Sequence, residues 1–361
     1  MKKILAHNPL KSRDLLLWYQ NNARELPWRK TSDPYKIWIS EVMLQQTTVN
    51  AVINYYHRWL KRFPTIQSLA RGNIHDILNL WQGLGYYQRA RNIHKAAQII
   101  YKDHHGEIPK NPKVLRKLPG FGPYTTNAVL SIAYELRLPL IDTNIRRLVM
   151  RQLALRGVAN IKQNKTITTY LEKIMPKKNI SFFNQALMEL GALICKPKNP
   201  LCLLCPIQKN CKAFQKGIQE LIPKTSKNKI KKINAAIALI QKERKFFIQK
   251  RPEKGLLAGL WEFPGGKQEK EKKIEETLKR EIKEELKVSV TKSDFLMKVK
   301  HYYTQFAVTL HVFTCDVVPF PLEDDTHKWV ILKNLKNFPM PSGSAKIVSK
   351  LKHDDNQQRR A

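Results

Sequence analysis

The chain has 361 residues, of which 42% are hydrophobic, so it is long enough for two or three domains with buried cores. Lysine and arginine number 65 against 29 aspartate and glutamate residues, a formal net charge of +36. There is no run of about 20 apolar residues and no secretion signal, so we expect a cytoplasmic protein, located at the nucleoid in a bacterium. Such a charge predicts a polyanionic partner, most simply nucleic acid.

Residues 10–215 have apolar positions at helical spacing, punctuated by Pro and Gly. Residues 216–232 lose this spacing and include the basic stretch 224–232, which is typical of a linker. From Ile233 the pattern favours strands, with one charged helix in between. We predict strands at 235–240, 245–249, 306–318 and 329–332, and helices at 274–286 and after Ser344. The chain is therefore expected to be multidomain, with an all-α domain (1–215), a linker (216–232) and an α+β domain (233–361).

Four of the five cysteines lie together at 195–211 with the spacing C-x6-C-x2-C-x5-C. Four thiolates in one loop suit either a tetrahedral zinc ion or an iron–sulfur cluster, and the spacing does not decide between them. Disulfides are disfavoured because the chain has no secretion signal. We therefore predict a metal centre with these ligands: Cys195, Cys202, Cys205 and Cys211.

A glycine-rich turn at 118–122 joins two helical patterns within about 113–131. Gly120 and Gly122 allow a tight turn and a close approach to a large anion, and the following helix start can bind a phosphate. This is a helix-hairpin-helix pattern, which contacts the nucleic-acid backbone rather than the bases. Asp142 follows Gly122 by twenty residues.

The hairpin, Asp142 and the four-cysteine loop together resemble the endonuclease III superfamily of DNA glycosylases, and the details resemble its adenine-specific MutY branch. The tracts that match this branch are Leu26-Pro27-Trp28-Arg29, Ser40–Thr47, Gly83–Tyr87 and Phe183–Gly191. The resemblance covers nearly all of residues 10–225. It implies that the four cysteines hold a 4Fe-4S iron–sulfur cluster. It also implies a monomer that binds double-stranded DNA with adenine opposite 8-oxoguanine or guanine.

Cleavage of the bond between adenine and its sugar needs a proton on the base and negative charge near the sugar cation. Two carboxylates in different environments can divide these roles. Glu41 lies among apolar residues, which raise a carboxyl pKa and suit a general acid. The resemblance implies that Glu41 protonates the base and that Asp142 stabilises the cation. The structural alternatives are an exposed helix glutamate for Glu41 and a helix N-cap for Asp142.

Tyr124 occupies the hairpin position where bifunctional relatives carry a lysine that forms a Schiff base. We therefore expect base excision without strand cleavage and, from the resemblance, a role for Tyr124 in ordering the carboxylates. The branch usually has Asp-Gly-Asn after the hairpin, and Thr143 departs from this pattern. Asn144 is retained and could hold a phosphate near Asp142.

Adenine within a duplex is out of reach of any active site, so it must be flipped out and its gap filled. The resemblance places wedge and lesion contacts at Gln46, Thr47, Leu84 and Tyr86. It places the adenine pocket at Trp28, Arg29 and Gln185. Packing within the protein is the structural alternative for these residues, and for Leu84 in particular.

Residues 258–286 resemble the Nudix box. Glu281, Glu284 and Glu285 fall on one helix flank and could hold Mg²⁺ beside a diphosphate. However, Lys272 and Lys287 replace the box's first Glu and its closing Gly. Three interpretations stay open: a lesion-recognition domain, a weak nucleotide hydrolase, and charge decoration of a solvated helix.

The MutY branch recognises 8-oxoguanine with a Phe-Ser-His turn, and the matching place here is Tyr303-Thr304-Gln305. Thr304 keeps a hydroxyl that can donate and accept. The main prediction is a monofunctional adenine DNA glycosylase. The alternatives are a pyrimidine glycosylase with lyase activity, like endonuclease III, and a Nudix hydrolase of oxidised nucleotides on a DNA-binding scaffold.

Overall fold

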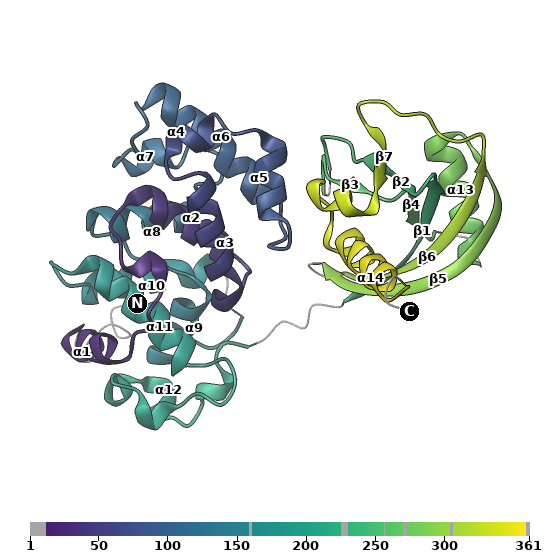
Figure 1. Cartoon of the computed structure of the whole chain (residues 1–361). Coiled ribbons are helices and arrows are strands. Elements are labelled where there is room, and N and C mark those ends of the chain that lie inside the picture. Colours follow the sequence, from purple (N-terminus) through teal and green to yellow (C-terminus); the bar gives the residue numbers. More distant parts are fainter. Residues whose placement is uncertain are drawn as a thin grey trace. The chain divides into compact units, whose positions relative to one another are not determined.

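The computed structural model describes residues 12–158, 161–224, 230–255, 257–269, 273–303 and 306–358. These residues fold into two compact units, each described by itself (Figure 1). The first contains the described residues up to Gly72 and from Asn92 to Lys224. The second contains Asn73–Arg91 and the described residues from Ile230 onward. Within the described ranges, no helix is long and apolar enough to cross a membrane.

The first unit is helical, which confirms the prediction for its part of residues 10–215. Its main helices are α1 (Ser12–Asn22), α2 (Pro34–Leu44), α3 (Val49–Arg62), α4 (Ile66–Ala70), α7 (Pro112–Leu115), α8 (Pro123–Tyr134), α9 (Thr143–Gln152), α10 (Ile161–Ile174), α11 (Ile180–Leu193) and α12 (Lys212–Gln215). Helix α6 (Gln88–Asp103) begins in the second unit and continues into the first. Single 3-10 turns lie at Pro27–Arg29, Cys202–Leu204, Gln208–Asn210 and Gln219–Leu221.

One apolar core joins the helices that carry the predicted site. Helix α9 contributes Leu148 and Val149 to this core, and α11 contributes Phe183 and Leu187, all of them fully buried. Residues of α1, α8 and α10 pack around them. Each such side chain contributes about 1.5–3 kcal/mol of hydrophobic free energy relative to exposure. The first residues of α9 and the inner face of α11 are therefore held firmly in place.

The second unit is built around a mixed seven-stranded sheet. Its strands are β1 (Lys231–Lys242), β2 (Lys245–Lys250), β3 (Trp261–Glu262), β4 (Gly265–Lys267), β5 (Ser289–Tyr303), β6 (Phe306–Val318) and β7 (His327–Ile331). The order is β3-β2-β1-β6-β5, with β4 paired to β1 and β7 to β2. Strands β1 and β6 run parallel, while the other pairs are antiparallel.

Helices cover both faces of this sheet (Figure 1). Alternate residues of β1 enter two different cores: Ile237 and Leu239 lie with α14 (Ser342–Gln358), and Ala238 and Ile240 lie with α13 (Ile274–Leu286). This is the period of two that a strand buried on both faces requires. The α+β prediction for the C-terminal part is thus confirmed, and α13 begins and ends where the sequence predicts.

Two features of the second unit were not predicted. Strand β5 is long, but its pairing with β6 shifts register between Val290 and Lys292 and again between Phe295 and Met297. These shifts change which side chains face the core and erase a simple alternation. In addition, α5 (Ile74–Trp81) and the loop after it belong to this unit. The hydroxyl of Tyr87 donates to the carbonyl oxygen of Met340 over 2.8 Å.

Candidate active site and cysteine loop

Glu41 lies on a helix that is buried along nearly its whole length. Asp33 caps α2 by accepting from the amides of Tyr35 and Lys36, and Pro34 occupies the first helical position. Every residue from Ile37 to Met43 is buried, and Glu41 itself is 5% exposed. This burial raises the pKa of Glu41 to about 7, the direction predicted from its apolar neighbours.

The Tyr124 hydroxyl donates to Oε2 of Glu41 over 2.8 Å. This bond lowers the pKa of Glu41, but less than burial raises it. Tyr124 is the second residue of α8, whose N-cap is Gly122 and whose first residue is Pro123. Gly120 adopts φ +82°, and a Cβ there would lie 3.0 Å from Cβ of Asn92, so only glycine fits this turn without strain.

Asp142 is the N-cap of α9, as its structural alternative predicted. Its Oδ1 accepts from the Ile145 amide over 2.6 Å, and its Oδ2 accepts from Nδ2 of Asn144 over 3.1 Å. Burial nevertheless raises the pKa of Asp142 above its ordinary value, and these hydrogen bonds counteract the rise. The N-cap position and a position beside the active site are therefore compatible.

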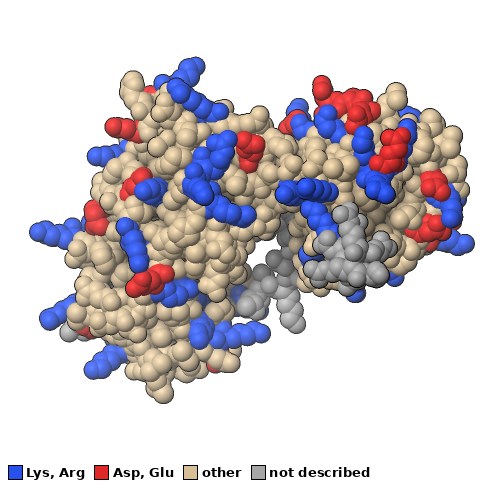
Figure 2. Space-filling view, viewed as in Figure 1, with Lys and Arg blue, Asp and Glu red and all other residues tan. Residues whose placement is uncertain are grey.

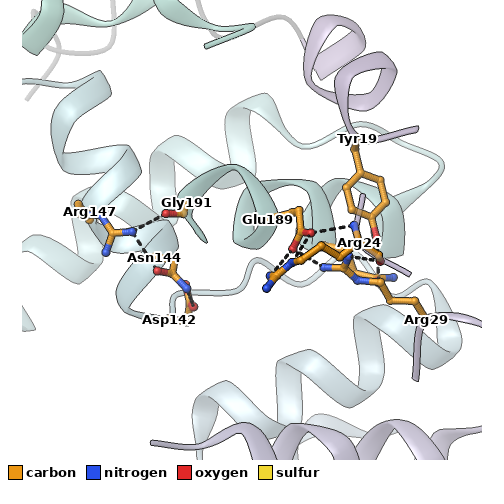
Figure 3. A network of polar contacts seen from close by, with 9 residues as sticks. Tyr19, Arg24, Arg29, Asp142, Asn144, Arg147, Glu189 and Gly191 are labelled. Carbon is orange, nitrogen blue, oxygen red and sulfur yellow. Dashed lines mark hydrogen bonds and ion pairs between the residues drawn. The ribbon is translucent and has the colours of Figure 1, made fainter. Parts of the chain in front are cut away.

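The side chain of Asn144 is held in place by Arg147. Arg147 donates from Nη2 to Oδ1 of Asn144 over 2.9 Å and to the carbonyl of Gly191 over 2.6 Å, as Figure 3 shows. Its Nε donates to the carbonyl of Cys195 over 2.8 Å. A Cβ on Gly191 would lie 2.7 Å from Cβ of Asn144, so glycine allows α11 to approach α9 here. Arg147 thus links the Asp142–Asn144 pair to the start of the cysteine loop.

Glu41, Tyr124, Asp142 and Asn144 line one cavity of about 730 Å³. Most residues that the sequence assigned to the active site line it, namely Trp28, Arg29, Glu41, Gln46, Thr47, Gly120, Gly122, Tyr124, Asp142, Asn144 and Gln185. Gln46 has φ +58°, a left-handed backbone that glutamine rarely adopts. The cavity therefore brings together segments separated by more than a hundred residues in sequence.

Sequence reasoning missed Glu189, which also lines the cavity and is 1% exposed. Arg24 reaches it through Nε and Nη2, both at 2.8 Å, and Arg29 through Nη2 at 2.7 Å (Figure 3). Burial alone would raise the pKa of Glu189, but these hydrogen bonds outweigh it and lower the pKa to about 2. The available signal was a lone carboxylate inside the apolar tract of α11.

Gln185 is fixed in orientation at the cavity wall. The hydroxyl of Tyr19 donates to Oε1 of Gln185 over 3.1 Å, and Nε2 of Gln185 donates to the Ser181 hydroxyl over 2.9 Å. The guanidinium of Arg29 lies 5.4 Å from the centre of the Tyr19 ring. This wall of the cavity is therefore a connected polar network.

The remaining predicted contacts lie elsewhere. Leu84 and Tyr86 belong to the second unit and do not line the cavity, and Leu84 is 5% exposed. Arg89 donates to the carbonyls of Leu84 and Gly85, which fixes this loop, and Tyr86 has φ +48°. Thr304 lies outside the described residues.

The four loop cysteines line a second, smaller cavity together. None of these four cysteines forms a disulfide. Burial raises the pKa of Cys205 to about 12, and the neighbouring cysteines add to this. Among the described residues, no three His, Cys, Asp or Glu side chains converge as a site for a single metal ion.

The carboxylates of α13 are engaged with neighbours. Arg280 pairs with Glu281 and with Glu284, each at 2.9 Å. Oε2 of Glu285 accepts from Nε2 of Gln249 over 2.7 Å. Each of these three carboxylates thus already has a partner within the protein.

Comparisons with known proteins agree with this architecture. Residues 39–177 match the HhH-GPD superfamily of base excision DNA repair proteins, and residues 235–350 match the NUDIX domain. The solved structure of a thermostable thymine-DNA glycosylase is 28% identical with a TM-score of 0.53, covering 57% of this chain and 95% of that chain. A trapped endonuclease III–DNA covalent intermediate is 24% identical with a TM-score of 0.50, covering 58% and 95%. The fold and the cavity thus define a base excision repair glycosylase of the helix-hairpin-helix superfamily.

Relatives over most of the chain narrow this class. The adenine DNA glycosylase of Buchnera aphidicola subsp. Schizaphis graminum is 37% identical over 343 residues, covering 92% of this chain and 96% of that protein. The Schizosaccharomyces pombe enzyme is 30% identical over 395 residues, covering 90% and 86%. The Homo sapiens enzyme is 31% identical over 306 residues, covering 69% and 56%. The chain belongs to the adenine DNA glycosylase family.

Proposed function

We propose that the chain removes adenine mispaired with 8-oxoguanine or guanine in double-stranded DNA and leaves an abasic site. One observation carries the proposal: a buried carboxyl group with a pKa of about 7, Glu41, and a second carboxylate, Asp142, line the same cavity. An acid with a pKa near neutrality can donate a proton at working pH, and a second carboxylate can stabilise positive charge. The family's name gives the base to be released.

In this mechanism Glu41 donates its proton to the leaving adenine while the bond to the sugar breaks. The hydrogen bond from Tyr124 fixes the carboxyl group in one orientation. Positive charge then develops on the sugar, and the Asp142 carboxylate stabilises it. Asp142 keeps its position because two donors, the Ile145 amide and Asn144, hold its oxygens. Water then adds to the sugar cation and gives up a proton, which the Glu41 carboxylate can take back.

The reaction is expected to stop at the abasic site. Strand cleavage by this superfamily's bifunctional members requires an amine that forms a Schiff base. The position that would carry it is Tyr124, and none of the described residues lining the cavity is a lysine. The nearest hairpin lysine in sequence, Lys117, does not line the cavity.

The flipped adenine would occupy the wall formed by Trp28, Arg29, Gln185 and Glu189. Trp28 offers an aromatic face, although it is 7% exposed and packs edge-on against Tyr56. The polar groups offer donors and acceptors at fixed positions, since Tyr19 and Arg24 hold Gln185 and Glu189. Such preorganised polar groups reject bases that leave them unpaired.

The duplex would lie across the hairpin. The α8 N-terminus has no side-chain cap, so its amides are available to a phosphate. Gln46 and Thr47 would contact the DNA beside the cavity, Leu84 and Tyr86 would fill the gap, and Thr304 would contact the lesion. Many lysine and arginine side chains lie on the visible surface, consistent with the net charge of +36 (Figure 2). Binding is therefore expected to weaken steeply with salt.

The cysteine loop is proposed to hold a 4Fe-4S cluster. Four cysteine sulfurs around one cavity are the donor set that such a cluster requires. The resemblance to the endonuclease III superfamily is what favours a cluster over zinc. A cluster would supply structural cross-linking of the loop.

We assign lesion recognition, rather than nucleotide hydrolysis, to the domain at 233–361, after the glycosylase domain (1–215) and the linker (216–232). The ion pairs that occupy Glu281 and Glu284 support this choice. A magnesium ion would have to displace Arg280 first. No magnesium site is therefore proposed.

The test uses the full chain in single-turnover reactions with duplexes carrying adenine opposite 8-oxoguanine, guanine or thymine. Alkali then reveals abasic sites, and borohydride traps any Schiff base. We expect abasic sites opposite 8-oxoguanine and guanine, little product opposite thymine, and no trapped adduct. A trapped adduct with a pyrimidine lesion would support the endonuclease III-like alternative. Absence of adenine release from folded, iron-loaded protein would refute the proposal.

A further inference from the structure

Arg151 is one of the largest fully buried side chains of the protein. It lies on α9 one turn after Arg147 and is 2% exposed. Among the described residues, the hydrogen-bond partners of its guanidinium are backbone carbonyls and one cysteine sulfur, not carboxylates. A buried cation normally has a counter-charge, because removing it from water costs several kcal/mol. The surroundings of Arg151 must therefore provide one.

Every contact of the Arg151 guanidinium is with the cysteine loop or with the segment that follows it. Nη1 donates to the carbonyl of Lys196 over 2.6 Å and approaches Sγ of Cys195 at 3.3 Å. Nη2 donates to the carbonyl of Pro197 over 3.0 Å, and Nε donates to the carbonyl of Ile222 over 2.8 Å. Carbonyl oxygens satisfy the directions of the donors but carry no net charge. Cys195 would be a thiolate as a cluster ligand, and its sulfur lies within reach of the Arg151 guanidinium.

Through its hydrogen bond to Ile222, Arg151 also contacts the end of the helical unit. Ile222 is 1% exposed and packs in the same core as α9 and α11. Two residues later, the Lys224 amide donates to the carbonyl of Gly157 over 3.0 Å. One side chain thus joins the first cysteine, the two residues after it and the last described segment of the helical unit.

We propose that Arg151 is a positioning residue for the iron–sulfur cluster, whose charge neutralises the cluster ligand Cys195 and whose hydrogen bonds close the cysteine loop against Ile222. The proposal rests on the cluster being present, which is part of the proposed function. It makes two separable statements. The charge of Arg151 stabilises the more negative, reduced form of the cluster, and its fork of donors slows loss of iron.

Two variants separate charge from geometry. Arg151→Lys keeps the positive charge but cannot reach four acceptors with one ammonium group. Arg151→Met removes both charge and donors at similar length. Arg146→Met is the matched control: it removes a cation from the same helix, but Nε of Arg146 contacts Oδ1 of Asn164 and not the loop. Thermal unfolding followed by circular dichroism identifies any variant that fails to fold.

The readouts are the rate of iron loss to a chelator and the midpoint potential of the cluster, both on the full chain. We expect iron loss to accelerate about 10–100-fold in both Arg151 variants, the usual range for a group that supports metal ligands. The midpoint potential should fall in Arg151→Met and stay near that of the unaltered chain in Arg151→Lys. Arg146→Met should change neither quantity.

The outcomes distinguish this proposal from the proposed function. If the unaltered chain contains no iron or sulfide, the cluster itself is absent and the proposed function loses that part. If it contains a full cluster, but Arg151→Lys and Arg151→Met retain iron and potential unchanged, the role of Arg151 is refuted. A folded Arg151→Lys with unchanged iron retention is alone enough to refute the loop-closing statement.

Discussion

Each of the two units contains a group of carboxylates, and the two groups differ in their hydrogen-bond and ion-pair partners. In the cavity of the helical unit, Glu41 is buried and accepts one hydrogen bond from a neutral phenol, Tyr124. On α13, Glu281 and Glu284 share Arg280. A carboxyl group without a cationic partner can gain and lose a proton near neutral pH. Arg280 already occupies acceptor oxygens of Glu281 and Glu284, so the same residue type has different surroundings in the two places.

Substitution of Glu41 gives the largest expected effect and the most direct test of this difference. Glu41→Gln keeps the shape of the side chain but has no acidic proton, so the single-turnover rate of adenine release should fall by up to about 10⁴-fold. Glu284→Gln is the matched control on α13 and should leave this rate unchanged. Equal losses in both variants, measured on the same duplex, would remove the distinction between the two groups.

Asp142→Asn should lower the rate of adenine release by about 10²–10³-fold. Asparagine can still cap α9, because its side-chain oxygen accepts from the Ile145 amide as the aspartate does now. The loss would therefore report the missing negative charge and not a disordered helix. Unfolding in urea checks this: a stability close to that of the unaltered chain is required for the charge interpretation to stand.

Glu189→Ala is expected to lower the free energy of unfolding by about 3 kcal/mol, because it leaves Arg24 and the mostly buried Arg29 without their shared partner. Glu25→Ala removes an exposed partner of Lys30 and should have no measurable effect on unfolding in urea. If the two variants unfold at the same urea concentration, the ion pairs of Glu189 with Arg24 and Arg29 do not stabilise the fold.

The ion pairs of Glu189 with Arg24 and Arg29 should also make the stability of the fold depend on pH. Because the pKa of Glu189 is lowered to about 2 in the folded protein, its contribution is complete above the ordinary pKa of a glutamate. It is lost as the pH falls toward about 2. Glu189→Gln should therefore show a smaller acid destabilisation than the unaltered chain in thermal melts over this range.

Tyr124→Phe is expected to have the smallest effect on rate, about 10-fold, since it removes one hydrogen bond to a carboxyl group. That bond lowers the pKa of Glu41, so its loss should raise this pKa further above about 7. The acid form persists to higher pH, and the fall in rate with rising pH should move upward. A profile that moves downward, or keeps its position, would contradict the assigned contact.

Most of the cavity could be predicted because its residues lie in contiguous tracts. Glu41 and Tyr124 lie in short motifs, and the apolar neighbours of Glu41 already indicate its raised pKa. Glu189 could not be assigned in this way, because its importance comes from Arg24 and Arg29, more than 150 residues earlier in the chain. The roles of all these residues stay predictions until variants are measured.

The elements of the fold likewise differ in whether a local sequence pattern predicts them. Strand β1 contains a continuous apolar run and helix α13 has a regular apolar period, and both were predicted within a few residues. Strand β5 was missed because its register shifts turn successive side chains to different faces and break the alternation. The grouping of Asn73–Arg91 with the second unit depends on contacts such as Tyr87 with Met340, for which a local pattern carries no signal.

The most direct measurement is the identity and rate of release of the free base from a duplex with adenine opposite 8-oxoguanine, at pH values below and above about 7. We expect adenine as the only released base, an intact strand before alkali, and a rate that falls as the pH rises through the pKa of Glu41. A rate that rises over this range, a cleaved strand, or the absence of free adenine would contradict it.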